Sequence, residues 1–182
     1  MKMKWVTCVF LVLVAVAIRL PAQQSEADRK LLADIRAKAE KGDAQSQAAL
    51  GSAFSFGSLG VVKDEMEAAK WFRKAAEQNY AKAQHNLGAA YAGGQGVAKD
   101  ETEAVKWFRK AAEQNYAQAQ FKLGLCYSKG KGVAKDDVEA VKWYRKAADQ
   151  NDAWAECSLG ICYSHGEGVV KDDAEALKWT RK

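Results

Sequence analysis

Residues 81–107 read AKAQHNLGAAYAGGQGVAKDETEAVKW, and this stretch decides the fold. The same pattern recurs with a period of 36 residues, in copies that begin at Ala81, Ala117 and Ala153. An earlier copy begins at Ala44 and holds one extra residue, within 56–60. A constant period over four copies indicates a repeat architecture, in which each unit packs against its neighbours instead of folding around one central core.

Each copy divides into two predicted helices separated by a glycine-rich turn. Before the second helix, an aspartate is followed three residues later by a glutamate, at Asp64, Asp100, Asp136 and Asp172. This spacing is typical of a capping box, in which the aspartate accepts from free N–H groups of the first turn and the glutamate reaches back. The second helix is predicted to end at a residue that tolerates the left-handed conformation, at Gly42, Asn79, Asn115 and Asn151. Asp43 and Asp152 are predicted to cap the first helices that follow them.

A glycine recurs inside the first helix, at Gly51, Gly88, Gly124 and Gly160. Such a glycine costs about 1 kcal/mol relative to alanine, so its recurrence indicates close approach of the partner helix. We expect the recurring tryptophan of the second helix to pack over this gap, as a structural core residue without a ligand role. These tryptophans are Trp71, Trp107, Trp143 and Trp179.

The pattern of residues 81–107 resembles the Sel1-like repeat (SLR), which is related to the tetratricopeptide repeat, over about 140 residues. The resemblance implies an all-α fold, a right-handed superhelix (solenoid) of antiparallel helix pairs, and usually a scaffold for other proteins. The repeats are predicted at 43–79, 80–115, 116–151 and, truncated, 152–182, with an N-terminal capping helix over 25–41.

Residues 1–22 have the features of a signal peptide. Lys2 and Lys4 precede an uncharged run from Trp5 to Ile18. This run is shorter than the roughly 20 residues that a membrane-spanning helix needs. The sequence therefore predicts an exported protein, periplasmic or secreted, with no permanent membrane span.

Charge and cysteine content favour neither nucleic acid binding nor a disulfide framework. Removal of 1–22 lowers the number of Lys and Arg from 28 to 25, against 23 acidic residues, so the mature chain is nearly neutral. Cys126, Cys157 and Cys162 remain, an odd number that allows at most one internal pair.

Residues that differ between the copies are candidates for recognition, because the repeated residues make the fold. The first helices differ at relative positions 2, 5 and 9, and by the resemblance this face lines the concave side of the superhelix. We predict that it binds a protein segment through Lys82, His85, Gln118, Phe121, Leu125, Trp154 and Ile161. Packing between repeats is the alternative explanation for the same residues, and it stays open at this point.

Metal and phosphate sites are not predicted. Cys157, Cys162 and His165 superficially suggest a metal site, but on a helix the two cysteines point about 140° apart. The recurring G-x-G motifs, such as Gly94 to Gly96, follow no predicted strand and are interpreted as turns. The sequence predicts no cofactor and no catalytic residue.

An alternative function comes from a cysteine-rich branch of the SLR family, whose members are reported to bind or hydrolyse beta-lactams. Ser128 and Lys131 match the S-x-x-K motif of penicillin-recognising enzymes, but S-D-N and K-T-G are missing. That branch pairs one cysteine from each helix, whereas the second-helix positions here hold Ala112 and Ala148. A non-catalytic protein is therefore preferred.

The last repeat stops at Lys182, before its second helix is complete. Because solenoid ends normally need a polar cover, the sequence suggests either a fragment or self-association through this open end.

Overall fold

The structure, a computed structural model, describes residues 25–180, so the predicted signal peptide lies outside the described residues. Over 25–180 the chain forms helices and no strand, which confirms the all-α prediction. The helices are α2 (Glu26–Glu40), α3 (Ala44–Phe56), α4 (Glu65–Glu77), α5 (Ala81–Gly93), α6 (Glu101–Glu113), α7 (Ala117–Lys129), α8 (Asp137–Ala148), α9 (Ala153–His165) and α10 (Asp173–Thr180).

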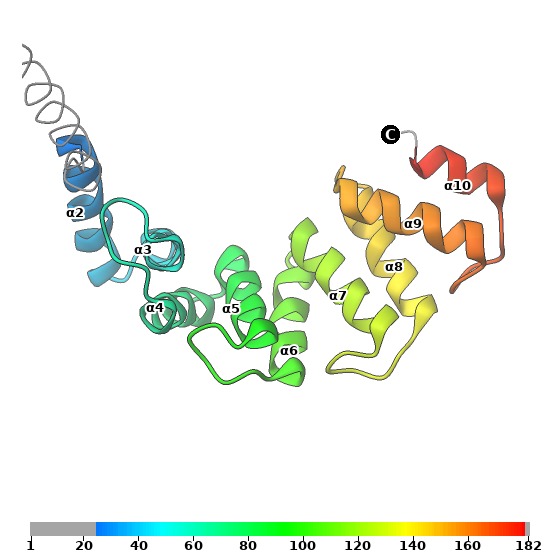
Figure 1. Cartoon of the computed structure of the whole chain (residues 1–182), viewed down its shortest axis with the longest axis horizontal. Coiled ribbons are helices and arrows are strands. Elements are labelled where there is room, and N and C mark those ends of the chain that lie inside the picture. The colour runs from blue at the N-terminus through cyan, green and yellow to red at the C-terminus, as the bar shows by residue number, and fades with distance from the viewer. Residues whose placement is uncertain (1–24, 181–182) are drawn as a thin grey trace, which may run out of the picture.

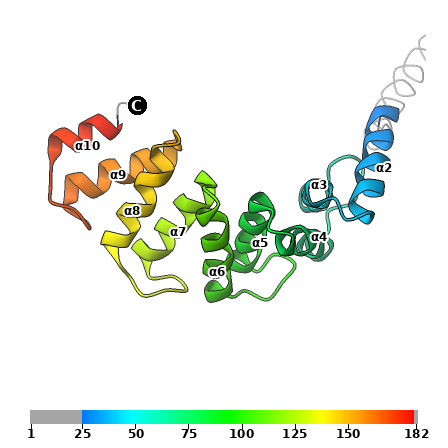
Figure 2. The same ribbon diagram turned by 180° about the vertical axis from the view of Figure 1, so that it is seen from behind.

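The helices from α3 onward form four hairpins, each a first helix (α3, α5, α7 or α9) followed by a second helix (α4, α6, α8 or α10). Figures 1 and 2 show the hairpins side by side in an arc, with α2 at one end and α10 at the other. The glycine-rich turns from α5 to α6 and from α7 to α8 lie along the outer edge of this arc (Figure 1). The chain is thus the predicted solenoid of antiparallel helix pairs.

The helix ends follow the predicted pattern, with one difference. Asp100 caps α6 by accepting from the backbone N–H of Glu103 at 2.9 Å, and Asn115 after that helix has a φ of 63°. Asp43 and Asp152 cap α3 and α9 as predicted. The reciprocal half of the capping box is wrong: the Asp100 N–H donates to Tyr91 O of the preceding helix, and Glu103 instead accepts from Lys106 Nζ at 2.8 Å.

The core lies between hairpins as well as within them. One buried cluster combines Phe72 and Ala75 of α4 with Leu87 of α5, and Trp107 of the following helix α6 packs against it. The leucine of each first helix is completely buried, at Leu50, Leu87, Leu123 and Leu159. Each hairpin therefore completes the core of the one before it, which explains why the repeats must stack.

The prediction that tryptophan packs over the helix glycine is wrong. The residue after the tryptophan takes that place: an added Cβ at Gly88 would lie 2.8 Å from Cδ1 of Phe108, and the neighbour of Gly124 is Tyr144. Successive helix residues point 100° apart, so only one of the two can face the partner helix. Phe108 lies over the glycine of its own hairpin, whereas Trp107 packs against the cluster that its hairpin shares with the preceding one.

The second glycine of each G-x-G turn is a contact between hairpins. A Cβ at Gly96 would lie 1.9 Å from Glu65 O at the start of α4 in the preceding hairpin. In the same way, Gly132 meets the start of α6 and Gly168 meets the start of α8. Gly96 also has a φ of +69°, which side chains disfavour. These turns are therefore structural, as the sequence indicated.

A row of buried amides, which was not predicted from the sequence, also links the hairpins. Gln84 Nε2 donates to Ala76 O at 3.2 Å and to Asn79 Oδ1 at 3.1 Å, and Gln84 Oε1 accepts from Gln114 at 2.7 Å. Gln120 repeats this arrangement one hairpin later. The amide can both donate and accept, so it satisfies groups on two helices at once.

Candidate functional site

Each first helix exposes one row of side chains, at relative positions 2, 6, 9 and 13. Steps of four, three and four residues keep such a row within an arc of about 60° on a helix. We name these residues the first-helix stripe: Gln45, Ala49, Ser52 and Phe56 on α3, Lys82, Asn86, Ala89 and Gly93 on α5, Gln118, Lys122, Leu125 and Lys129 on α7, and Trp154, Ser158, Ile161 and His165 on α9. All of them are at least partly exposed, and their identity differs from copy to copy.

Five of the predicted binding residues belong to this stripe. They are Lys82, Gln118, Leu125, Trp154 and Ile161. Leu125 is half-buried, whereas Trp154 is 73% and Ile161 53% exposed. The structure does not test whether they bind a partner, so their role stays a prediction.

The other two predicted residues, His85 and Phe121, lie at position 5 and pack between helices. The His85 ring centroid is 5.7 Å from that of Phe108 and 5.4 Å from that of Tyr116. Phe121 stacks in a tilted geometry on Tyr144, with centroids 5.9 Å apart. Burial, and secondarily the charge of Lys122, lowers the pKa of His85 to about 4. These two rings therefore contribute mainly to packing between helices, within their own hairpins and, for His85, against Tyr116 at the start of the next one.

The stripe residues at position 6 were not among the predicted binding residues. Positions 5 and 6 each lie three or four residues from positions 2 and 9. Spacing alone therefore did not show which of the two belongs to the exposed row. The signal was in the side chains: position 6 holds Asn86, Lys122 and Ser158, whereas position 5 holds rings in two of the copies.

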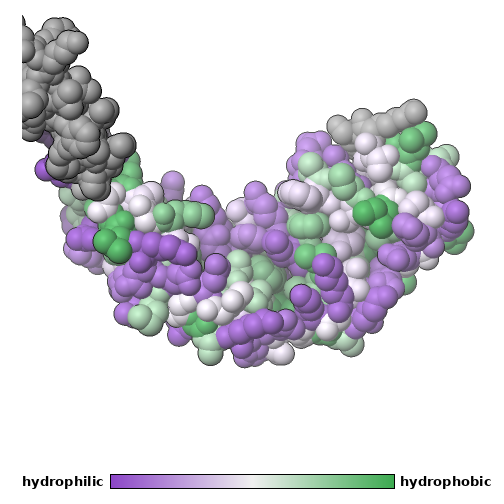
Figure 3. All heavy atoms as spheres, in the orientation of Figure 1, coloured by the Kyte–Doolittle hydropathy of each residue, from purple (hydrophilic) through white to green (hydrophobic). Residues whose placement is uncertain are grey.

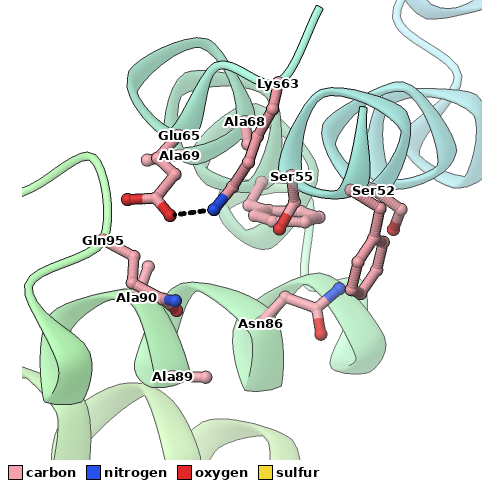
Figure 4. A pocket seen from close by; sticks show the side chains of 12 residues that line it. Ser52, Ser55, Lys63, Glu65, Ala68, Ala69, Asn86, Ala89, Ala90 and Gln95 are labelled. Atoms are coloured by element: carbon pink, nitrogen blue, oxygen red, sulfur yellow. Dashed lines mark ion pairs between the residues drawn. The ribbon is translucent and has the colours of Figure 1, made fainter. Parts of the chain in front are cut away.

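The stripe contains a hollow of about 300 Å³ between the first and second hairpins. Figure 4 shows α5 on one side, with Asn86 and Ala89, and Ser52 and Ser55 across from it. Lys63 and Glu65 form an ion pair of 2.7 Å at the same hollow. Its stripe residues are small or neutral, so this part of the surface can accept a side chain from outside.

The stripe becomes more apolar toward α9. Where α5 has Ala89, α7 has Leu125 and α9 has Ile161, so a branched side chain occupies the place of a small one. Figure 3 shows hydrophobic residues standing out over α9 and α10 among hydrophilic ones. An exposed tryptophan and an exposed isoleucine on one face of a helix are typical of a protein contact surface.

The described residues provide little for chemistry on a substrate. Burial is the main factor that raises the pKa of the Cys162 thiol, to about 11, and it also raises that of Cys126, so both favour the unreactive thiol form. Cys126, Cys157 and Cys162 are all free. Between residues 25 and 180, no three His, Cys, Asp or Glu side chains gather in a way that could hold a metal ion. Over the same range, no helix is long and apolar enough to cross a membrane.

Comparison with known families identifies the repeats. The family model described as Sel1 repeat matches residues 44–80, 81–116, 117–152 and 155–182. No curated protein is significantly similar to the chain.

Solved structures with the same architecture are also similar in sequence. The protective antigen c5321 of uropathogenic Escherichia coli, described as displaying an SLR fold, is 42% identical with a TM-score of 0.78, over 81% of this chain and 32% of that one. A Sel1 repeat protein of Oxalobacter formigenes is 44% identical with a TM-score of 0.71, over 76% and 57% of the two chains. Cysteine-rich protein B of Helicobacter pylori is 26% identical with a TM-score of 0.57, over 70% and 93%. The chain thus spans about a third and somewhat over half of the first two proteins.

Proposed function

Because the chain belongs to the Sel1 repeat family, we propose that it is a non-catalytic scaffold that binds a protein segment on the first-helix stripe. Sel1 repeat proteins generally serve in protein–protein interactions. One observation carries the location: Trp154 and Ile161 are exposed on the stripe, at positions where the family pattern demands no apolar residue. Repeat architectures commonly recognise partners through such unshared surface residues.

The exposure of the apolar residues at the α9 end of the stripe favours the binding of a partner over packing between repeats as their role. Burial of an exposed aromatic side chain against a partner contributes strongly to protein interfaces, and Trp is enriched among the residues that dominate them. Trp154 is 73% exposed, so the hairpins of this chain leave most of its ring available.

Substitution of Ile161 tests the location with a matched control. Ile161 on the first helix α9 is 53% exposed, and Val138 on the second helix α8 is 54% exposed. Serine at Ile161 removes an apolar side chain from the stripe, and serine at Val138 removes a comparable one outside the stripe, as the control. The full chain is used as bait in a crosslinking pull-down with quantitative mass spectrometry. We expect Trp154→Ala and Ile161→Ser to reduce recovery of a specific partner at least tenfold and Val138→Ser to leave it unchanged. Equal recovery with all three variants would place the contact elsewhere.

We further propose that the protein acts outside the cytoplasm. The support is the sequence of residues 1–22, with two lysines before an uncharged run, which has the pattern of a secretory signal. Fractionation of cells that produce the full chain tests this, with N-terminal sequencing of the mature form. Recovery of uncleaved chain in the cytoplasm would contradict export.

A further inference from the structure

The charged residues of the first-helix stripe are of one sign on α5 and α7. Lys82, Lys122 and Lys129 lie on these two helices, and neither helix contains Asp or Glu. His85, packed behind the stripe, has a pKa of about 4 and is therefore neutral at pH 7. The second helices differ, since α4 and α6 carry both signs.

The charge of these three lysines is not neutralised within the described residues. Their ammonium groups form no ion pair with a described carboxylate. In contrast, Lys106 on α6 pairs with Glu103 at 2.8 Å, and Lys99 before that helix pairs with Glu101 at 3.0 Å. One lysine on each of α4, α6 and α8 is thus paired with a glutamate, whereas the three stripe lysines have no such partner among the described residues.

The lysines lie between the two other features of the stripe. The hollow with Ser52 and Asn86 is on the α3 side, and Trp154 and Ile161 are on the α9 side. A segment that crosses the four hairpins thus meets a hollow, then positive charge, then an apolar surface.

We propose that the stripe binds an acidic polypeptide segment whose apolar side chains contact the hollow and Trp154. This inference rests on the proposed function and adds the chemistry of the partner. Charge complementarity selects among partners more than it adds affinity, because exposed ion pairs are individually weak. The preference should therefore weaken as salt screens the lysines.

A selection from random peptides tests the inference without a known partner. The probe is a displayed library of dodecapeptides with equal frequencies of acidic and basic residues, selected on the immobilised full chain at low and at high salt. Two triple variants are compared with the wild type. Lys82→Gln, Lys122→Gln and Lys129→Gln remove the stripe charges. Lys70→Gln, Lys106→Gln and Lys142→Gln remove the same number of charges from lysines paired with glutamate on the second helices.

We expect the wild type and the second-helix variant to enrich peptides with a mean net charge of about −2, and the stripe variant to enrich peptides near zero. Circular dichroism melting establishes that both variants fold. Enrichment of neutral or basic peptides by the wild type would overturn the inference. If such peptides still require Trp154, the proposed function stands without the acidic preference. If the wild type enriches nothing beyond the bare support, both proposals fail.

Discussion

Phe108 lies against Gly88, so close that an added Cβ would be 2.8 Å from both Cδ1 and Cε1 of the ring and 3.2 Å from Ala104 O. The glycine of the first helix and the aromatic residue of the second helix therefore set the distance between the two helices of a hairpin. Phe72 with Gly51 and Tyr144 with Gly124 repeat this contact.

Gly88→Ala should destabilise the protein. Alanine gains about 1 kcal/mol of helix propensity, but the forced movement of Phe108 costs about 1–3 kcal/mol, so we expect a net loss. Gly93→Ala on the same helix is the control, because its nearest neighbour is the flexible side chain of Gln95 at 3.3 Å. Urea unfolding followed by circular dichroism measures both. A higher urea midpoint for Gly88→Ala than for the wild type would show that the two helices can move apart without loss of stability.

Gly96→Ala should cost more than Gly94→Ala. Both residues have left-handed φ angles, +69° and +71°, so both substitutions bear a similar backbone penalty of about 1–2 kcal/mol. Only the Cβ at position 96 also meets the preceding hairpin, 1.9 Å from Glu65 O. We expect an additional loss of at least about 1 kcal/mol in urea unfolding, from weakened contact between hairpins. Equal losses would mean that the turn does not hold the hairpins together.

His85 should make stability depend on pH between 6.5 and about 4. Burial lowers its pKa in the folded protein to about 4, whereas the unfolded chain keeps the ordinary value of 6.5. Between these values the unfolded state binds more protons, so stability is complete above pH 6.5 and falls as the pH drops toward 4, by at most about 3 kcal/mol. Phe108, Tyr116 and Lys122 surround the ring and supply no acidic partner.

His85→Phe should remove this part of the pH dependence, since the next hairpin has Phe121 at the same position. The measurement is the urea midpoint at pH 7.0, 5.5 and 4.5 for wild type, His85→Phe and the exposed control His165→Gln. The prediction fails if wild type and His85→Phe lose stability in parallel over this range.

Glu156→Gln should stabilise the fourth hairpin. Glu156 is 8% exposed and stands where Gln84 and Gln120 donate to a carbonyl and an asparagine of the preceding hairpin. A carboxylate cannot make these donations, and the side chain of Glu156 has no hydrogen bond or ion pair within residues 25–180. Glutamine would donate to Ala148 O and Asn151 Oδ1, for a gain of about 1 kcal/mol in urea unfolding.

Gln84→Glu is the reverse experiment. It places a carboxylate opposite Ala76 O and Asn79 Oδ1 and should destabilise at pH 7 by about 1–3 kcal/mol. Stability that changes in the same direction for Gln84→Glu and Glu156→Gln would contradict the role assigned to the amides.

Much of the fold could be predicted because the repeat makes its local signals redundant. Asp64, Asp100 and Asp136 each cap a second helix, and Asn79, Asn115 and Asn151 each end one with a φ of 63°. The reciprocal glutamate bond could not be predicted, because Glu103 has a competing lysine three residues later and the aspartate N–H has a carbonyl of another helix.

The candidate site was predicted in part. Trp154 and Ile161 were found because an apolar residue at an unshared position is visible in the sequence. His85 and Phe121 were grouped with them because positions 5 and 6 differ by only 100° around the helix. Which of the two faces solvent depends on where the next hairpin lies, and Asn86 and Lys122 therefore came from the structure.

By itself, the sequence determined the repeat, the helix ends and the division between shared and unshared residues, because these depend on contacts within a few residues along the chain. The tertiary structure decided that Phe108 and not Trp107 lies over Gly88, that Gln84 joins two hairpins, and that the stripe lysines have no described acidic partner. Each of these depends on the distance and rotation between helices, which are determined by side-chain packing across the hairpins and not by any local pattern.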